Sequence, residues 1–263
     1  MHQLNNKIKT IESKWLDILI SFNQEKFKNV GLSSHNEEHH LRVWCFVKEI
    51  IKTLNATITF NEKELESLII ATFFHDLGMV RTRDVSHGHE SRRFCESFFS
   101  SNNFPRPDKF EETLKIIEKH DDKDYKNTDS QPTLLSILAM ADDLDAFGLI
   151  GAVRYAEIYL LRDIALDQLP QKVIFNAQRR FHHLKRNLKE FPDFLGIHQK
   201  RYESLLEFYR TAQRYEPVIK NIHYNIEKSK NYKLIDLIEP AYNSTVKEFR
   251  NQLQEELREF ILP

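Results

Sequence analysis

Apolar residues recur three or four positions apart along almost the whole chain, which is the spacing of one face of an α-helix. The first such segment covers residues 8–22, and a second is expected over about 36–54, where Ser33 or Ser34 can act as its N-cap. Asn61 is expected to cap a third helix that ends near position 75, with Gly78 as its stop. The pattern therefore predicts an all-α fold.

Composition agrees with a helical protein. The chain has 263 residues with only 6 Gly and 8 Pro, and 29% of it is charged. Prolines are expected to separate the later helices and to mark the start of the last one: Pro170, Pro192, Pro217 and Pro240. We expect one helical domain over residues 1–165, which carries the chemistry, and a helical extension over 166–263 packed on the same domain.

Charge and cysteine content narrow the class of protein. The net charge is −1, so no global field favours nucleic acid or an acidic membrane surface. Cys45 and Cys95 each lie inside an expected helix and are interpreted as reduced thiols. No apolar stretch approaches the roughly 20 residues that span a bilayer. These features predict a cytoplasmic protein, with nucleic acid disfavoured, no membrane contact and self-association left open. Basic residues near the candidate ligands described below add the expectation of a small anionic substrate.

The dipeptide His75-Asp76 is the strongest chemical signal. It follows residues 68–74, of which six are apolar, so an imidazole and a carboxylate emerge where a buried segment stops. Ionisable groups are costly at such a place unless something binds them, and a divalent metal would bind both. Asp142 ends a second apolar run, over 134–141, where an unpaired carboxylate again suggests a cation.

Other His and Asp residues compete for roles near these two positions. His35 and His39 lie four residues apart, so on one helix both can point into one site, whereas His40 is turned by roughly 100° from His39. Asp143 and Asp145 compete with Asp142 for a ligand role. The basic, partly apolar segment 178–186 is interpreted as a solvated helix face rather than as a contact with RNA.

The order His39, His75-Asp76, Asp142 resembles the HD-domain superfamily of metal-dependent phosphohydrolases. The resemblance covers about residues 30–160 and includes the apolar run before His75 and the segment 141–146. It implies a bundle of five or more helices that holds a metal. In such proteins the ligand Asp directly follows an Ala, which selects Asp142.

The resemblance extends to the branch of the superfamily that holds two metals. It implies His89 and His120 as further ligands, with His87 as a competitor for His89, and Asp76 as the carboxylate that bridges both ions. Imidazoles with two carboxylates suit two divalent transition-metal ions, Mn, Fe, Co, Ni or Zn, better than Ca²⁺.

The resemblance also implies a reaction. A metal-activated hydroxide would cleave a phosphoester, most naturally of a nucleotide. His35 resembles the histidine of cyclic-nucleotide phosphodiesterases that gives a proton to the leaving oxygen. Basic residues near the ligands are expected to bind the substrate, namely Arg42, Lys119 and Arg154.

Two alternatives use the same ligands. A few members of the superfamily are mixed-valent diiron oxygenases, and others are catalytically silent regulatory domains. Cyclic-di-nucleotide phosphodiesterases of the HD-GYP type are disfavoured, because no His-Glu pair and no Gly-Tyr-Pro follow His120.

Overall fold

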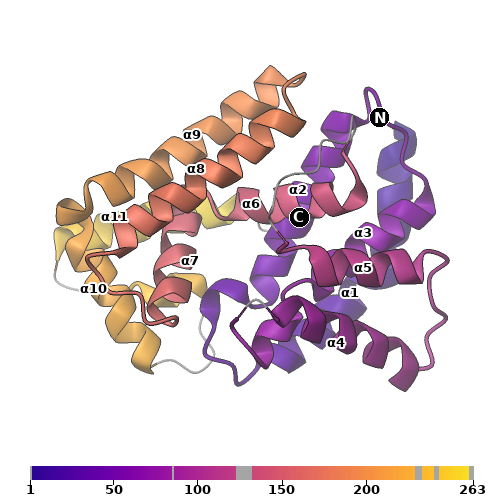
Figure 1. The fold of residues 1–263 in the computed structure, drawn as a ribbon, viewed down its shortest axis with the longest axis horizontal. Coiled ribbons are helices and arrows are strands. Elements are labelled where there is room, and N and C mark those ends of the chain that lie inside the picture. The colour runs from indigo at the N-terminus through magenta and orange to yellow at the C-terminus, as the bar shows by residue number, and fades with distance from the viewer. Residues whose placement is uncertain (1, 85, 123–131, 229–232, 240–242, 261–263) are drawn as a thin grey trace. The chain divides into compact units, whose positions relative to one another are not determined.

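The computed structural model describes residues 2–84, 86–122, 132–228, 233–239 and 243–260, and their regular secondary structure is helical (Figure 1). These residues form eleven α-helices and three short 3-10 turns, with no strand among them. The prediction of an all-α fold is confirmed. None of the helices in these ranges has the length and apolar character that a membrane crossing needs.

The chain divides into two compact units. The first contains residues 1–28 and 40–142, and the second contains residues 29–39 and 143–263. The division falls after Asp142, so residues 143–165 group with the C-terminal helices. The expected domain boundary near residue 165 stays a prediction. The packing of a C-terminal extension on the same domain stays a prediction.

The first unit is built around a buried helix, α3. Its elements are α1 (His2–Phe27), most of α2 (Glu37–Leu54), α3 (Glu62–Phe74), η2 (Leu77–Val80), α4 (His87–Ser101), α5 (Phe110–Lys119) and most of α6 (Leu134–Asp145). Helices α1 and α5 both pack on α3, and α4 packs on α5. Every residue of α3 from Leu65 to Phe74 is buried, which explains why that stretch of sequence is almost uniformly apolar.

Capping fixes where α3 begins, and a close backbone contact explains the glycine that follows it. Asn61 accepts a hydrogen bond from the Glu64 N–H at 3.0 Å, and the Glu64 carboxylate accepts from the Asn61 N–H at 3.0 Å, which confirms the predicted cap. Gly78 is not the helix stop; it lies within η2. A Cβ atom there would lie 2.0 Å from the main-chain oxygen of His87, so Gly78 allows η2 to approach α4.

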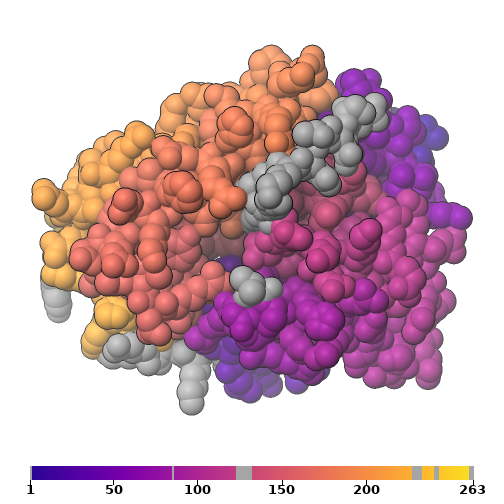
Figure 2. Space-filling view, viewed as in Figure 1, coloured from indigo at the N-terminus to yellow at the C-terminus, as the bar shows by residue number. Residues whose placement is uncertain are grey.

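The second unit surrounds helix α7. Its elements are η1 (Ser33–His35), α7 (Gly148–Leu160), α8 (Leu169–Asn187), α9 (Pro192–Arg210), α10 (Ala212–Lys228), η3 (Leu234–Leu237) and α11 (Ser244–Arg258). Helices α9, α10 and α11 and the turn η1 all contact α7. Helices α8 and α9 pack side by side and form part of the surface of this unit, as Figure 2 shows in orange.

The prolines behave differently from one another. Pro170 and Pro192 occupy the first turns of α8 and α9, where the missing N–H is harmless. Pro217 lies inside α10, so the break that was predicted there is wrong. Pro240 lies outside the described residues.

The start of α2 corrects a second expectation. Asn36 is extended, with ψ of −170°, and separates η1 from α2, which begins at Glu37. The Asn36 side chain accepts a hydrogen bond from the Glu38 N–H at 3.1 Å, so Asn36 takes the capping role that was expected of Ser33 or Ser34. The prediction that His35 lies on the same helix as His39 is therefore wrong.

Candidate metal centre

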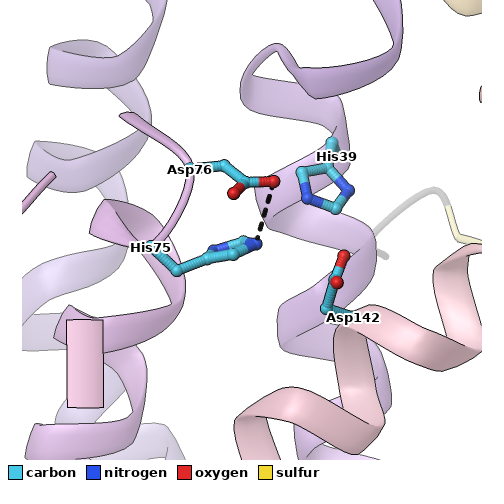
Figure 3. A group of neighbouring side chains, drawn as sticks. All are labelled: His39, His75, Asp76 and Asp142. Carbon is cyan, nitrogen blue, oxygen red and sulfur yellow. Dashed lines mark ion pairs between the residues drawn. The ribbon is translucent and has the colours of Figure 1, made fainter. Parts of the chain in front are cut away.

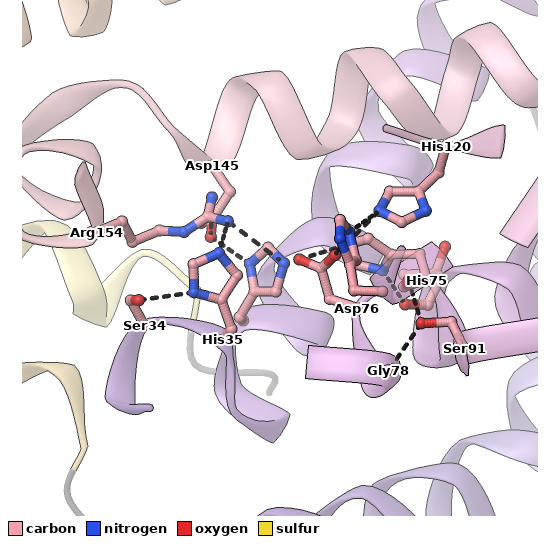
Figure 4. A network of polar contacts seen from close by, with 12 residues as sticks. Ser34, His35, His75, Asp76, Gly78, Ser91, His120, Asp145 and Arg154 are labelled. Carbon is pink, nitrogen blue, oxygen red and sulfur yellow. Dashed lines mark hydrogen bonds and ion pairs between the residues drawn. The ribbon is translucent and has the colours of Figure 1, made fainter. Parts of the chain in front are cut away.

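Asp76 is the centre of a buried group of imidazoles in the first unit. Its Oδ1 atom lies 3.0 Å from Nε2 of His120 and 3.2 Å from Nε2 of His87, and its Oδ2 atom lies 3.4 Å from Nε2 of His75 (Figure 4). The two nitrogens of His87 and His120 are themselves only 3.2 Å apart. All four residues are buried. The fold thus concentrates three Nε2 atoms around one carboxylate.

Main-chain carbonyls orient the three imidazoles of this group. Each ring places Nδ1 2.7 Å from the carbonyl oxygen of the residue three positions earlier, namely Thr72 for His75, Asp84 for His87 and Ile117 for His120. A carbonyl oxygen can only accept, so each Nδ1 carries the hydrogen and donates it. A neutral ring then presents the lone pair of Nε2 towards Asp76, which is the tautomer that binds a metal.

This arrangement is electrostatically incomplete without a cation. The lone pairs of His87 and His120 would face each other and the Asp76 carboxylate, so either a proton or a metal ion must lie among them. Burial alone would lower the pKa of His87, but the hydrogen bond to Asp76 and the charge of that carboxylate outweigh it and raise the pKa to about 9. The donor chemistry therefore fits a divalent metal that replaces this proton.

Asp76 also belongs to a second group of donor atoms. His39, His75, Asp76 and Asp142 are all buried, and each offers one ligand atom within 4.8 Å of the others (Figure 3). His39 lies in the first turn of α2, a helix that continues unbroken into the first unit, and Asp142 lies in the last turn of α6. These two groups are those found among the described residues, and Asp76 is common to both.

His39 is oriented by a carboxylate instead of a carbonyl. Its Nδ1 atom lies 2.7 Å from Oδ2 of Asp145, which has no solvent exposure. A carboxylate oxygen accepts, so Nδ1 of His39 donates and Nε2 is the nitrogen left for a metal. Arg154 of α7 approaches the same Asp145 oxygen with Nη1 at 3.0 Å and so compensates the buried negative charge.

The structure separates the three aspartates that the sequence left in competition. Asp142 is the one in the donor group, as the resemblance had selected. Asp143 accepts from Arg180 at 2.8 Å and lies 3.4 Å from Nδ1 of His183. Asp145 orients His39. Successive positions on a helix point in different directions, so three nearby carboxylates acquire three sets of neighbours.

His89 is the predicted ligand that the structure does not bring to the group. Its side chain is 56% exposed and lies 3.3 Å from the Glu118 carboxylate, while His87 contacts Asp76. The two histidines are two positions apart on α4, which turns their side chains about 200° away from each other. The structure therefore brings His87, and not the predicted His89, into the donor group with Asp76 and His120.

A signal for this choice was present in the sequence. The buried face of α4 includes His87, Ser91, Cys95 and Phe98, at spacings of four, four and three residues. The phase of that face excludes His89. Ser91 supports the same face, because its hydroxyl donates to the main-chain oxygen of His75 at 2.6 Å and accepts from the Gly78 N–H at 2.7 Å (Figure 4).

His35 and Arg154 lie together although they come from distant parts of the sequence. The His35 and His39 ring centroids are 5.3 Å apart, and Nε2 of His35 lies 3.4 Å from Nη2 of Arg154 (Figure 4). The same Nη2 atom lies 3.5 Å from Nε2 of His39. The other His35 nitrogen, Nδ1, lies 2.7 Å from the Ser34 hydroxyl. His35 is thus next to a candidate ligand without belonging to either donor group.

The other two predicted substrate-binding residues differ in position. Arg42 is buried in α2, three residues after His39. Lys119 precedes His120 but is 51% exposed and lies 3.8 Å from Asp122. Asp122, the partner of Lys119 in this ion pair, belongs to neither donor group.

An all-α unit with buried His and Asp donor atoms at helix ends defines a candidate metal-binding domain. The family is given by comparison with known proteins: residues 36–146 match the family model described as HD domain. The match covers 111 of the 263 residues and identifies this segment as an HD domain. No curated protein and no solved structure matches the chain.

Proposed function

We propose that this protein is a metal-dependent phosphohydrolase that cleaves a phosphoester, most naturally of a nucleotide. The match of residues 36–146 to the HD domain supports the class, since members of that superfamily are mostly hydrolases. The observation that carries the proposal is the position of Asp76, which is shared by two groups of donor atoms.

A shared carboxylate supports a site for two ions. His75, His39 and Asp142 would serve one ion together with Asp76, and His87 and His120 would serve the other together with Asp76. Imidazole and carboxylate donors suit Mn²⁺, Fe²⁺, Co²⁺, Ni²⁺ or Zn²⁺. Bound there, the ions would supply Lewis acidity towards phosphoryl oxygens and lower the pKa of a water nucleophile.

The chain supplies proton transfer and anion binding beside this site. The His35 ring lies next to that of His39, a member of one donor group. We assign Nε2 of His35 to proton transfer at the leaving oxygen, a task that suits a histidine near neutral pH. Arg154 is buried and faces His35 with Nη2 at 3.4 Å, so we assign it to an anionic oxygen of the substrate. Arg42 is the second candidate for that task.

In this proposal, the hydrogen bonds at Nδ1 of the four candidate histidine ligands orient their rings. They hold each Nε2 atom towards the metal before any ion binds, so little reorganisation is needed. Burial of the site also excludes bulk water, which strengthens the attraction between cationic groups and an anionic substrate.

The test is a phosphoesterase and nucleotidase panel on the purified full chain. The chain is first stripped with chelator and then given Mn²⁺, Co²⁺, Ni²⁺, Zn²⁺ or anaerobic Fe²⁺. We expect release of phosphate or nucleoside that depends on the added metal and persists without O₂. Asp76→Ala is the matched inactive control. Activity that appears only with iron and consumes O₂ in proportion to product would overturn hydrolysis and assign the chain to the diiron oxygenases of the superfamily.

A further inference from the structure

The Glu157 carboxylate accepts two hydrogen bonds, one at each oxygen, from the backbone that precedes His35. Its Oε1 atom accepts from the Ser33 N–H at 2.8 Å, and its Oε2 atom accepts from the Ser34 N–H at 2.6 Å. Glu157 is 1% exposed. Both N–H groups lie at the start of η1, where a helical turn has no partners of its own for its first donors. One carboxylate therefore fixes two consecutive peptide groups of the turn that carries His35.

The backbone hydrogen bond within this turn is long. η1 is only three residues long, and the bond from the His35 N–H to the Leu32 oxygen is 3.4 Å, beyond the usual range of roughly 2.7–3.2 Å. A single Ser or Asn side chain suffices to cap an ordinary helix. A carboxylate costs more free energy to bury than a neutral Ser or Asn side chain. We therefore interpret Glu157 as a group that restrains the backbone of this turn more strongly than an ordinary cap would.

Glu157 and Arg154 act on His35 from the same face of α7. They are three residues apart, which places both side chains on one side of the helix. Glu157 fixes the peptide of Ser34, whose hydroxyl contacts Nδ1 of His35 at 2.7 Å, and Arg154 faces Nε2 of His35 at 3.4 Å. One turn of α7 thus determines both the backbone position and the surroundings of this imidazole.

We propose that Glu157 is a positioning residue for His35, which it acts on through the backbone of Ser33 and Ser34. This inference rests on the proposed function, because it gives His35 a task that depends on its orientation. Glu157 holds the backbone of Ser33 and Ser34, which belong to neither donor group, so its loss is expected to reduce turnover without removing metal.

The first test replaces Glu157 by Gln in the full, metal-loaded chain. We expect kcat to fall about 10-fold to 100-fold, less than the roughly 10²–10⁴-fold typical of losing a proton-transfer group outright. KM should change far less than kcat, and bound metal should stay at the wild-type level. Wild-type kcat in Glu157→Gln would overturn the proposal.

Glu256→Gln is the matched control. Glu256 is also a largely buried glutamate that accepts a main-chain N–H, that of Leu149 at 2.7 Å, at the start of α7. Removing its charge should lower the melting temperature to a similar extent and leave kcat within about 2-fold of wild type, since its contacts with the Leu149 N–H and with Arg201 involve neither η1 nor His35. An equal fall of kcat in both variants would mean that Glu157 is merely structural and would overturn its positioning role.

A double-mutant comparison tests whether Glu157 acts through His35. In the His35→Ala background the further change Glu157→Gln should have no effect on kcat, because the group being positioned is absent. Multiplicative losses in the double variant would contradict the proposal.

A readout without catalysis separates this inference from the proposed function. Amide hydrogen exchange of residues 33–35 should be faster in Glu157→Gln than in wild type and unchanged in Glu256→Gln. Unchanged exchange in Glu157→Gln would overturn the positioning role. If the wild-type chain hydrolyses no phosphoester, the proposed function fails, while faster exchange would still support the hold of Glu157 on η1.

Discussion

His39 donates its Nδ1 hydrogen to Asp145 at 2.7 Å, and this bond leaves Nε2 for a metal. Asp145→Ala should therefore lower metal affinity about 10-fold to 100-fold, the usual effect of losing a partner that orients a ligand. Competition with a coloured chelator measures the change. Asp145→Asn, which keeps an acceptor oxygen, should lose less. Equal affinity in wild type and Asp145→Ala would show that His39 needs no such orientation or is not a ligand.

Asp76 should be the ligand whose loss removes the most metal. Its carboxylate is shared by both donor groups, whereas His39 and His87 each belong to one. We expect Asp76→Ala to retain almost no metal, and His39→Ala and His87→Ala each to retain a larger fraction. Elemental analysis of the three purified variants makes the comparison. A full complement of metal in Asp76→Ala would exclude its bridging role.

His87 and His89 form a natural pair of test and control. They lie two residues apart on α4, but only His87 is buried against Asp76 and His120. His87→Ala should lose metal, and His89→Ala should bind as wild type does. Both variants can be measured in the same titration. Metal loss in His89→Ala with full binding in His87→Ala would show that His89, and not His87, is the ligand.

His35→Ala should keep its metal and lose turnover. The ring lies 5.3 Å from that of His39 but belongs to neither donor group. A proton-transfer group typically contributes about 10²–10⁴-fold to the rate, so kcat should fall by that order. Elemental analysis and the metal-supplemented phosphoesterase assay together test this. Wild-type turnover would make His35 a bystander.

The metal-free protein should become less stable as the pH rises above neutrality. The pKa of His87 is raised from 6.5 to about 9, because Asp76 outweighs the opposing effect of burial. A histidine whose folded pKa is raised stabilises the fold fully below its unfolded pKa and loses that contribution as the pH rises through the folded value. The melting temperature in chelator should therefore fall between about pH 6.5 and pH 9.

His87→Gln is the control for this pH effect, since it removes the titrating group. The variant should lack the part of the fall that His87 causes. Metal competes with the same proton, so the apparent metal affinity of the wild-type chain should rise over the same pH window. A metal-free melting temperature that is independent of pH in this range, or the same fall in His87→Gln, would contradict the assignment of the titration to His87.

The helices and the candidate ligands His75 and Asp76 could be predicted from the sequence. Residues 68–74 form a buried helix end, and His75 and Asp76 follow it directly and are buried as well. The polar pair at the end of an apolar run is therefore visible in the sequence. Asn61 and Glu64 mark the start of α3 by a reciprocal capping contact between residues three positions apart. Such features depend on neighbours in the chain, so the sequence alone contains the information for them.

The order of motifs could identify the superfamily but not the phase of every helix. His87 and His89 are equivalent as residue types, and only the face of α4 that packs inward distinguishes them. Likewise the extended backbone at Asn36 separates His35 from α2, and no local sequence pattern predicted this interruption of the helix. The apolar periodicity of α4 could have indicated the face of His87, whereas the break at Asn36 goes with the packing of η1 on α7 and has no comparable local signal.

The sequence by itself therefore determined an all-α protein with a His/Asp set at the ends of buried helices, because burial of an apolar run and the placing of its polar ends are local consequences of residue type. The tertiary structure alone decided the partners of each donor atom. Asp145 meets His39 across 106 positions, and Glu157 meets Ser33 across 124. Hydrogen bonds over such separations form only when packing brings two helices together, and packing is a property of the folded chain as a whole.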